Sequence, residues 1–160
     1  MKIGSISEDR SREKRIAVTP DIIKKYISLG FEVCLSENYG SHLGIKDAQY
    51  VEMGAKISKD EMEILNSSDI IVQLAMLSDE KSSSIKENQI LIGVLNPYNN
   101  KEKLDNLARK KINLFSLELL PRITRAQSMD ILSSQANLAG YKAVIESFAN
   151  FEKAIPMMMT

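Results

Sequence analysis

Short runs of apolar residues alternate with amphipathic stretches along most of this chain. Two of the runs, DIIVQLA and QILIGVL, are mostly apolar from end to end, which is typical of parallel strands covered on both faces. The remaining runs are shorter or alternate, and stretches with helical spacing lie between them. The pattern predicts strands at residues 2–6, 31–37, 55–57, 69–75, 89–95 and 112–120.

Capping residues help to place the helices between these strands. In the first helix Thr19 is the expected N-cap, Pro20 takes the first helical position, and Gly30 ends the helix. Ser58 is the expected N-cap of a later helix. The predicted helices are residues 20–29, 45–54, 58–67, 99–111 and a long last one from about 128 to 153.

Strands that alternate with helices predict a doubly wound, mainly parallel α/β sheet of the flavodoxin-like or Rossmann-like kind. Right-handed crossovers place helices on both faces of such a sheet. A length of 160 residues fits one domain of ordinary size. Ligands of these folds bind beyond the carboxyl ends of the strands, so the segments that follow the strands are the first places to search for a site.

Composition and charge exclude several classes of protein. The 21 basic residues equal the 21 acidic ones, so nothing predicts binding to nucleic acid. No apolar run is long enough to insert into a membrane, and the N-terminus has no apolar core of a signal peptide. Cys34 is expected to be a buried strand thiol, and His42 has no second ligand at metal-binding spacing, so no metal site is predicted.

Polar residues gather directly after the last predicted strand, in PRITRAQSMD (residues 121–130). Arg122 offers a planar fork of donors, Gln127 offers donors and acceptors, and Asp130 offers two acceptor oxygens. Asp130 can hold Arg122 in place, and Ser133 adds a hydroxyl on the same helical face. This set suits a neutral ligand such as a carboxamide and ribose better than a phosphate, which calls for glycines and more positive charge.

The same residues have a purely structural interpretation. Thr124 and Gln127 have the spacing of a capping box, and Ser128 is an alternative N-cap of the last helix. Arg122 and Arg125 can pair with surface acids or stay solvated. The residues alone leave both interpretations open.

Three segments resemble one known family. PRITRAQSMDILSSQANLAGYKAV (121–144) is similar, nearly residue for residue, to the signature loop of the alpha subunit of proton-translocating NAD(P) transhydrogenases. The loop is named RQD after its arginine, glutamine and aspartate. Residues 3–33 and 37–57 resemble segments shared by transhydrogenases and alanine dehydrogenases.

The resemblance implies a role at the nicotinamide end of NAD(H). In the family pattern Arg122 and Ser133 contact the carboxamide, Asp130 orients Arg122, and Gln127 reaches the ribose region and the partner nucleotide. These implied roles make Arg122, Gln127 and Asp130 the expected catalytic residues, without any metal. Hydride then passes directly from NADH to NADP+ on a partner domain that binds NADP(H), coupled to proton translocation.

The resemblance also implies how the chain is organised. Residues 1–127 are expected to form an α/β domain that ends in the loop, and residues 128–160 a helix and tail that lead toward an NAD-binding domain. The seven glycines form no G-x-G-x-x-G, so that dinucleotide-binding Rossmann domain is expected to be absent. The chain alone is then expected to be inactive, with most of the cofactor affinity elsewhere.

The implied partners are the NADP(H)-binding and membrane components of the enzyme, and a second copy in a homodimer. The implied location is the cytoplasmic side of the inner membrane. Apolar residues near the end of the chain, Val144, Phe148, Phe151 and those at 155 and 157–159, are expected to be exposed in this chain and to promote oligomerisation.

Two other functions remain as alternatives. An alanine-dehydrogenase-like domain would use an arginine, a lysine and a histidine to bind a keto acid. Arg15 matches the arginine, but Gln73 stands where the lysine is expected and Asn96 near the histidine's place. Arg15 is more simply explained by a salt bridge near the end of the first strand. The third possibility is a stand-alone α/β interaction module.

Overall fold

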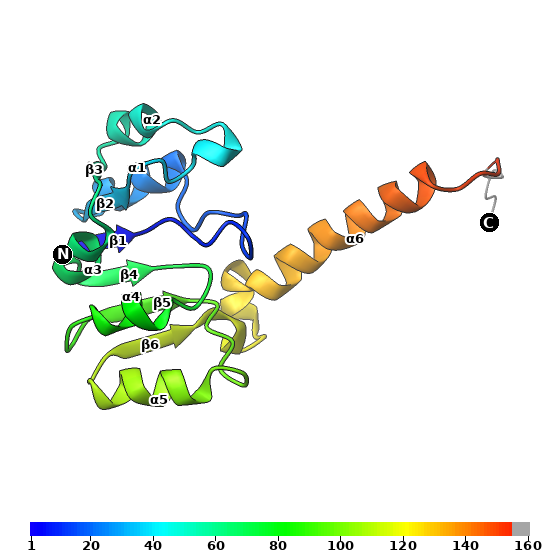
Figure 1. Ribbon diagram of the computed structural model, residues 1–160. Helices are drawn as coiled ribbons and strands as arrows, with labels where there is room; N and C mark the ends of the chain where they lie inside the picture. Colours follow the sequence, from blue (N-terminus) through cyan, green and yellow to red (C-terminus); the bar gives the residue numbers. More distant parts are fainter. Residues whose placement is uncertain (155–160) are drawn as a thin grey trace. The chain divides into compact units, whose positions relative to one another are not determined.

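The computed structural model describes residues 1–154 (Figure 1). Contacts within the chain divide it into two compact units, Met1–Leu119 and Leu120–Thr160. The first unit holds the whole sheet, and the second holds the 121–130 loop and the last helix. The domain boundary at residue 127 that the sequence suggests stays a prediction.

The first unit is built on one six-stranded sheet in the order β3-β2-β1-β4-β5-β6. Every neighbouring pair is parallel, so the sheet is parallel throughout rather than only mainly so. This order confirms the predicted doubly wound α/β fold. The strands are β1 (Lys2–Ser5), β2 (Glu32–Ser36), β3 (Lys56–Ser58), β4 (Ile70–Val72), β5 (Ile90–Gly93) and β6 (Asn113–Ser116).

Helices join the strands, and the predicted ones are present. They are α1 (Pro20–Ser28), α2 (Asp47–Glu52), α3 (Glu61–Ser67), α4 (Asp79–Ser83), α5 (Lys101–Arg109) and α6 (Ile131–Ala149). Three short 3-10 helices are added, η1 (Ser41–Leu43), η2 (Leu117–Leu119) and η3 (Thr124–Met129). The sequence pattern did not predict α4 because its residues, DEKSS, carry no apolar face.

The predicted caps are only partly right. Thr19 does occupy the N-cap of α1, but its side chain makes no capping hydrogen bond. The assignment of Ser58 is wrong, because Asp60 caps α3 and accepts hydrogen bonds from the backbone N–H groups of Met62 and Glu63. A carboxylate accepts two such bonds at once and also interacts favourably with the helix dipole.

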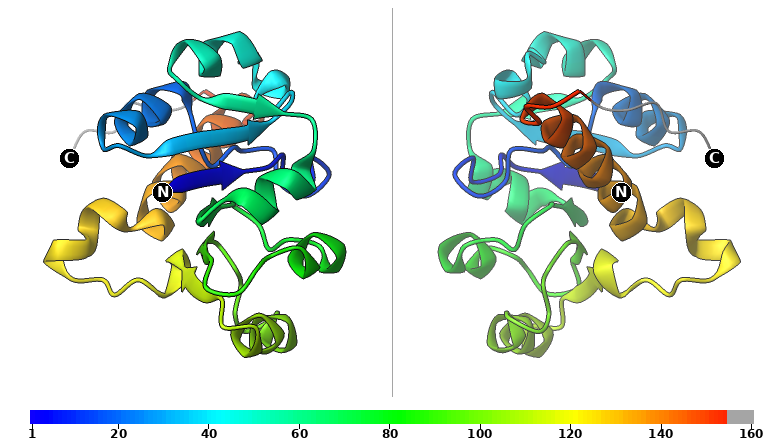
Figure 2. Two further views of the ribbon diagram at one scale, coloured as in Figure 1. Left: turned by 90° about the vertical axis from the view of Figure 1, so that its left-hand side faces the viewer. Right: turned by 90° about the vertical axis from the view of Figure 1, so that its right-hand side faces the viewer.

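Two apolar clusters fill the two faces of the sheet. One contains Ile23 of α1 and Tyr50 of α2 packed with strand residues such as Val33. The other contains Ile64 of α3 and Leu107 of α5, packed with further strand residues. Figure 2 shows α1 on one face and α3 and α4 on the opposite face. Alternate residues of β2 and of β4 therefore serve opposite cores, as in a doubly wound sheet.

The strand order reverses at β1, which pairs with β2 on one side and β4 on the other. Ile3 of β1 lies beside Ile70 of β4, and Gly4 beside Ile71. Ligands of such sheets bind where the order reverses, beyond the carboxyl ends of these two strands. On the far side of β4, Gly93 of β5 approaches so closely that a Cβ atom there would stand 2.3 Å from the Gln73 carbonyl oxygen.

The second unit contains η3 and α6. Apolar side chains on α6, among them Val144 and Phe148, are exposed as predicted. Phe151 is also exposed but lies beyond the end of α6, because the helix stops at Ala149. The methionines at 157–159 and the isoleucine at 155 lie outside the described residues. Within residues 1–154, no helix is both long enough and apolar enough to cross a membrane.

Candidate functional site

The 121–130 loop (Pro121–Asp130) carries the site residues that the sequence suggests. Its centre is η3, and Ala126 is its buried residue, whose backbone N–H donates to the carbonyl of Ile123 at 2.9 Å. The side chains of Arg122 and Gln127 are exposed. The loop backbone is thus helical at its centre, and its long polar side chains extend into solvent.

Asp130 and Ser133 are brought together at the start of α6. Asp130 is the N-cap of this helix: its Oδ1 accepts the backbone N–H of Ser133 at 2.9 Å, and its Oδ2 accepts the Ser133 hydroxyl at 2.6 Å. These two bonds are the main reason why the pKa of Asp130 is lowered. The alternative caps expected from the sequence, a Thr124–Gln127 box or Ser128, are therefore wrong.

Arg122 and Gln127 keep their hydrogen-bonding capacity. Within the part of the chain that the structure describes, neither side chain makes a hydrogen bond or an ion pair. The charge of Arg122 contributes to the lowered pKa of Asp130, but less than the Ser133 bonds do. Both oxygens of Asp130 are engaged by Ser133, so the orienting role that the resemblance assigns to Asp130 stays a prediction.

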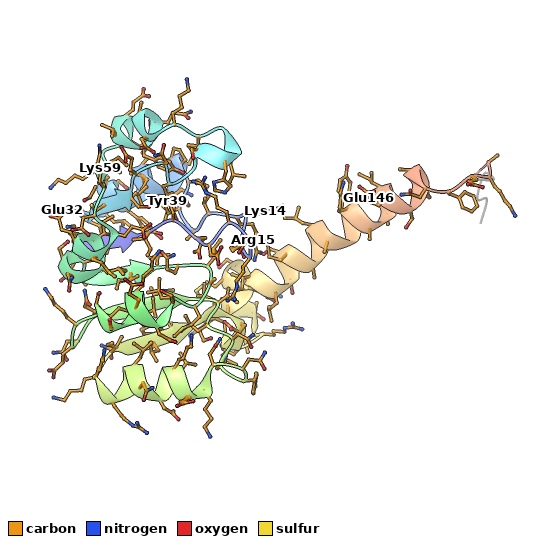
Figure 3. All side chains as sticks on the ribbon, in the orientation of Figure 1. Lys14, Arg15, Glu32, Tyr39, Lys59 and Glu146 are labelled. Carbon is orange, nitrogen blue, oxygen red and sulfur yellow. The ribbon has the colours of Figure 1, made fainter. Side chains whose placement is uncertain are left out.

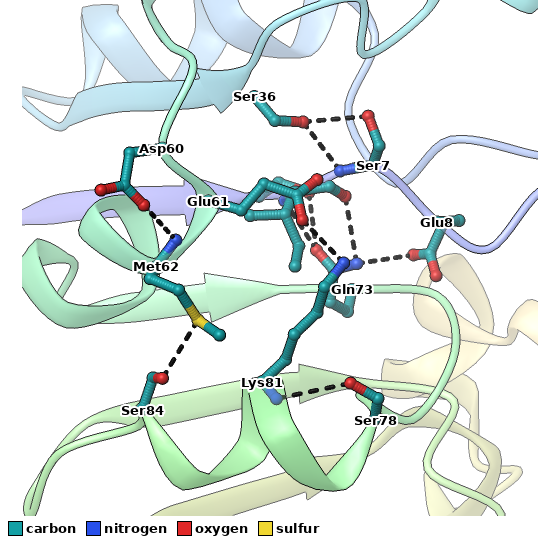
Figure 4. Close-up of polar contacts among 12 residues, drawn as sticks. Ser7, Glu8, Ser36, Asp60, Glu61, Met62, Gln73, Ser78, Lys81 and Ser84 are labelled. Atoms are coloured by element: carbon teal, nitrogen blue, oxygen red, sulfur yellow. Dashed lines mark hydrogen bonds and ion pairs between the residues drawn. The ribbon is translucent and has the colours of Figure 1, made fainter.

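A second candidate site lies wholly in the first unit, at the point where the strand order reverses. It is a cavity of about 430 Å³, called here the switch-point pocket. Residues after the ends of β1, β4 and β5 line it, among them Glu8, Gln73, Leu74, Ala75 and Asn96. Figure 4 shows Glu8 and Gln73 facing each other in this region.

Gln73 uses its whole side-chain amide inside the protein. Its Oε1 accepts the Ile6 backbone N–H at 2.9 Å and the Ser5 hydroxyl at 3.2 Å. Its Nε2 donates to the Ile6 carbonyl and to Glu8, each at 3.1 Å. The side chain is 2% exposed. Gln73 thus joins the end of β4 to the end of β1 with a fully satisfied amide.

Glu8 completes this connection from the loop between β1 and α1. Its Oε1 also accepts the Leu74 backbone N–H at 2.6 Å, and its Oε2 accepts the Ala75 N–H at 3.3 Å. Partial burial raises the pKa of Glu8, and the two backbone bonds oppose this effect. The loop after β1 is thereby tied to the residues after β4.

A tyrosine extends the network to a third segment. The hydroxyl groups of Tyr39 and Ser5 lie 2.8 Å apart, and the Tyr39 oxygen accepts the backbone N–H groups of Ala17 and Val18 at 3.2 and 3.3 Å. Burial raises the pKa of Tyr39 to about 12. Figure 3 labels Tyr39 inside the first unit.

The cations that line the switch-point pocket all have carboxylate partners. The predicted salt bridge of Arg15 is confirmed, since its guanidinium donates to Glu13 at 2.9 and 2.7 Å; Figure 3 labels Arg15. The pairs are Arg12–Asp9, Arg15–Glu13, Lys81–Glu61 and Lys103–Asp79. The pocket thus carries charge, but each positive group is balanced locally.

Sequence reasoning missed Glu8, Ser5 and Tyr39 as parts of a site. Glu8 and Ser5 both sit at or after the end of a predicted strand, which was a usable signal. For Gln73 the sequence shows only a departure from the lysine that alanine dehydrogenases are expected to have at this place. Cys34 is buried, as predicted, and the His42 ring bonds the Lys14 carbonyl at 2.7 Å. No group of three potential metal ligands occurs among residues 1–154.

Comparisons with known proteins identify the family. Residues 4–139 match the family described as alanine dehydrogenase/PNT, N-terminal domain. The first part of the NAD(P) transhydrogenase alpha subunit of Rickettsia prowazekii is 42% identical over 164 residues, which cover 100% of this chain and 43% of that protein. The corresponding protein of Rhodospirillum rubrum is 41% identical over 165 residues, with the same coverage.

A solved structure agrees with these relatives. The crystal structure of a transhydrogenase from Sinorhizobium meliloti superposes with a TM-score of 0.89 at 37% identity, covering 100% of this chain and 48% of that one. The chain therefore spans less than half the length of these relatives. The match over residues 4–139 shows that it belongs to the alanine dehydrogenase/PNT N-terminal domain family.

Proposed function

We propose that this chain supplies the nicotinamide side of the NAD(H) site in an NAD(P) transhydrogenase. The parent reaction transfers hydride between NADH and NADP+ and is coupled to proton translocation. The 121–130 loop and the start of α6 position the nicotinamide in this proposal. Two observations support it: the similarity to transhydrogenase alpha subunits, and the donors and acceptors that the loop leaves available.

The Asp130–Ser133 pair is the observation that carries the proposal. The Ser133 hydroxyl donates its proton to the Asp130 carboxylate at 2.6 Å, so the lone pairs of its oxygen remain available as acceptors. Arg122 carries only donors, and no residue described here engages them. A carboxamide presents one carbonyl acceptor and one NH₂ donor. Arg122 would bind the carbonyl, and Ser133 would accept from the NH₂.

Gln127 has a different role in the same proposal. Its exposed amide has both donors and acceptors and would reach the ribose region and the partner nucleotide. The bound nicotinamide supplies the hydride chemistry, and the protein supplies orientation. No side chain in the loop needs to act as an acid or base, which fits a set of arginine, glutamine and a carboxylate with a lowered pKa.

The remaining parts of the enzyme are proposed from its relatives. The chain covers 43% of the Rickettsia prowazekii protein, so most of the affinity for NAD(H) would come from the rest of that length, including a dinucleotide-binding domain. The chain alone would then be inactive. Its partners would be NADP(H)-binding and membrane components at the cytoplasmic side of the inner membrane, and the NAD(H)-binding component would be a homodimer.

The structure gives a specific reason to rank an alanine-dehydrogenase-like activity second. A keto acid needs a cation and an acid/base group near its carbonyl. Gln73, which replaces the expected lysine, is neutral, and its amide is hydrogen-bonded to Ile6, Ser5 and Glu8. Arg15 is paired with Glu13. A stand-alone interaction module remains the third candidate and predicts no response to nucleotide.

The proposal is tested by titrating the chain with NADH and following backbone amides by NMR. Saturable shifts are expected at Arg122, Gln127, Asp130 and Ser133, even at weak affinity. The Arg122→Ala variant should lose most of the shift at Ser133. Arg125→Ala is the matched control, because this arginine lies in the same loop but has no assigned contact. Equal loss in both variants, or no shifts in the folded chain, would contradict the assignment.

A further inference from the structure

The end of β4 presents a set of donors that matches a carboxylate. Two successive backbone N–H groups, of Leu74 and Ala75, point toward the two oxygens of one carboxyl group, at 2.6 and 3.3 Å. The Nε2 of Gln73 adds a third donor at 3.1 Å. Adjacent backbone N–H groups that converge in this way bind anions in many proteins. Here the carboxyl group is that of Glu8.

The loop that carries Glu8 is anchored elsewhere as well. Ser7 donates its backbone N–H to the hydroxyl of Ser36 at 2.8 Å, and Arg10 donates to the carbonyl of Asn38 at 3.0 Å. The His42 ring bonds the carbonyl of Lys14 at 2.7 Å. The loop is therefore held on both sides of Glu8 by contacts that do not involve its carboxylate.

The size and charge of the switch-point pocket limit which ligands other than Glu8 could reach the donors of Gln73, Leu74 and Ala75. Its volume of about 430 Å³ leaves ample space for a small organic acid. The four cations that line it are already paired with carboxylates. A ligand with several negative charges would find no unbalanced cation there, whereas a monocarboxylate would replace the single charge of Glu8.

We infer that the donors at the end of β4 form a carboxylate-binding site that Glu8 occupies as an internal ligand. The switch-point pocket then takes a small external monocarboxylate only when Glu8 is displaced. Glu8 occupies these donors in this chain and couples the loop after β1 to the residues after β4. This inference does not depend on the function proposed for the 121–130 loop.

Chemical rescue of Glu8→Ala tests the inference. Removing the carboxylate should lower the thermal unfolding midpoint, because the N–H groups of Leu74 and Ala75 lose their acceptor. Sodium acetate should then restore stability saturably. At ten times its Kd we expect a rise of about 4 °C over sodium chloride of equal ionic strength. The amide signals of Leu74 and Ala75 should shift with the same saturation.

Two control proteins define the specificity of this rescue. The wild type should show no acetate-dependent shift at Leu74 or Ala75, because Glu8 occupies the site. Asp60→Ala also removes a carboxylate that accepts two backbone N–H groups, but at an exposed helix start. It should show no rescue. An unresponsive Glu8→Ala, or an equal response in all three proteins, would overturn the inference.

A second measurement decides the matter if Glu8→Ala does not fold. In the wild type, the side-chain carboxyl carbon of Glu8 and the amide signals of Leu74 and Ala75 are followed as pH falls. All three should titrate together, with a midpoint above the ordinary value of 4.5. Independent titration would overturn the inference.

Other ionisable groups that face Glu8 must be followed in the same experiment. They are Glu13 and Arg15 on the same loop, Lys81 on α4, and Tyr39 after β2. The pKa values of Arg15 and Tyr39 are both raised, so these two groups keep their protons throughout the acid range. Glu13 is therefore the group that needs a separate control, and a Glu13→Gln variant should leave the joint titration of Glu8, Leu74 and Ala75 in place.

Discussion

The switch-point pocket and the 121–130 loop both follow the carboxyl ends of strands, yet they use their polar groups in opposite ways. In the pocket, Gln73 and Glu8 find their partners inside the protein. In the loop, the side chains of Arg122 and Gln127 make no hydrogen bond or ion pair with the residues described here. Buried polar groups need hydrogen-bond partners inside the protein for the fold to be stable. Exposed polar groups can bond with water and remain available to a ligand.

Because of this difference, we expect the pocket network to determine the stability of the fold and the 121–130 loop to determine ligand binding. Substitutions in the pocket network should change the free energy of unfolding and leave the nucleotide response of the loop alone. Substitutions in the loop should do the reverse. Substitutions of Asp130 or Ser133 should affect both quantities. The bond from the Ser133 N–H to Asp130 caps α6, and the bond from the Ser133 hydroxyl leaves its oxygen free to accept from a carboxamide.

The largest effect is expected from Gln73→Met, which keeps the length of the side chain and removes its amide. Ile6 would lose partners for both its N–H and its carbonyl, and Glu8 would lose one donor. Several uncompensated buried groups at about 1–3 kcal/mol each predict a loss of about 3–5 kcal/mol in the free energy of unfolding. Urea denaturation measures this loss.

The control for Gln73 is an exposed glutamine. Gln49→Met on α2 removes a single bond from the backbone N–H of Lys46 at an exposed helix start and should cost at most about 1 kcal/mol. The Gln73→Met protein, under conditions where it is folded, should still show the NADH-dependent shifts of the loop. Loss of those shifts in the folded variant would contradict the claim that the pocket network does not affect the nucleotide response of the loop.

A smaller effect is expected from Arg122→Ala in an assembled transhydrogenase that contains this chain. The hydride-transfer rate should fall roughly 100-fold, because the nicotinamide loses the group that orients it. NADH affinity should change only a few-fold if most binding contacts lie outside this chain. Stopped-flow kinetics and direct binding measurements separate the two quantities.

Arg125→Ala provides the comparison in the same assembly. It removes the same charge from the same loop, so any general electrostatic effect should appear in both variants. A rate near that of the wild type is expected. If affinity collapsed in Arg122→Ala while the rate per bound cofactor held, the positioning role would be wrong.

The arrangement of strands and helices was predictable because local patterns determine it. Continuous apolar runs such as QILIGVL mark buried parallel strands, and Gly30 and Gly54 end helices with positive φ angles that favour glycine. The loop residues were also proposed from the sequence, since polar groups cluster directly after a strand, and their role as a site stays a prediction. These signals lie within a few residues of the features that they predict.

The pocket network was not predictable from such patterns. Glu8 and Gln73 are 65 residues apart in the chain, and the pairing of β1 with β4 brings them together. The caps at Asp60 and Asp130 were missed for another reason. Serine, threonine and aspartate all compete for N-cap positions, and the geometry of the preceding turn decides which side chain reaches the N–H groups.

The smallest effect concerns Tyr39, at the far end of the pocket network, and it depends on pH. Tyr39→Phe keeps the ring but removes the oxygen that accepts from Ala17 and Val18 and bonds Ser5. Near pH 7 this should cost about 1–2 kcal/mol of unfolding free energy. Tyr98→Phe, on a tyrosine that is 86% exposed, should cost nothing measurable.

Raising the pH should then narrow the gap between Tyr39→Phe and the wild type. Burial raises the pKa of Tyr39 to about 12 in the folded protein, whereas an unfolded tyrosine titrates near its ordinary 10. Between these values the unfolded state releases a proton that the folded state keeps, so wild-type stability falls as pH rises. The Tyr39→Phe variant has no hydroxyl to ionise at this position, so its stability does not fall for this reason. Urea midpoints from pH 9 to 12 measure the gap, and a constant gap would show that the Tyr39 hydroxyl is not held as a buried donor in the pocket network.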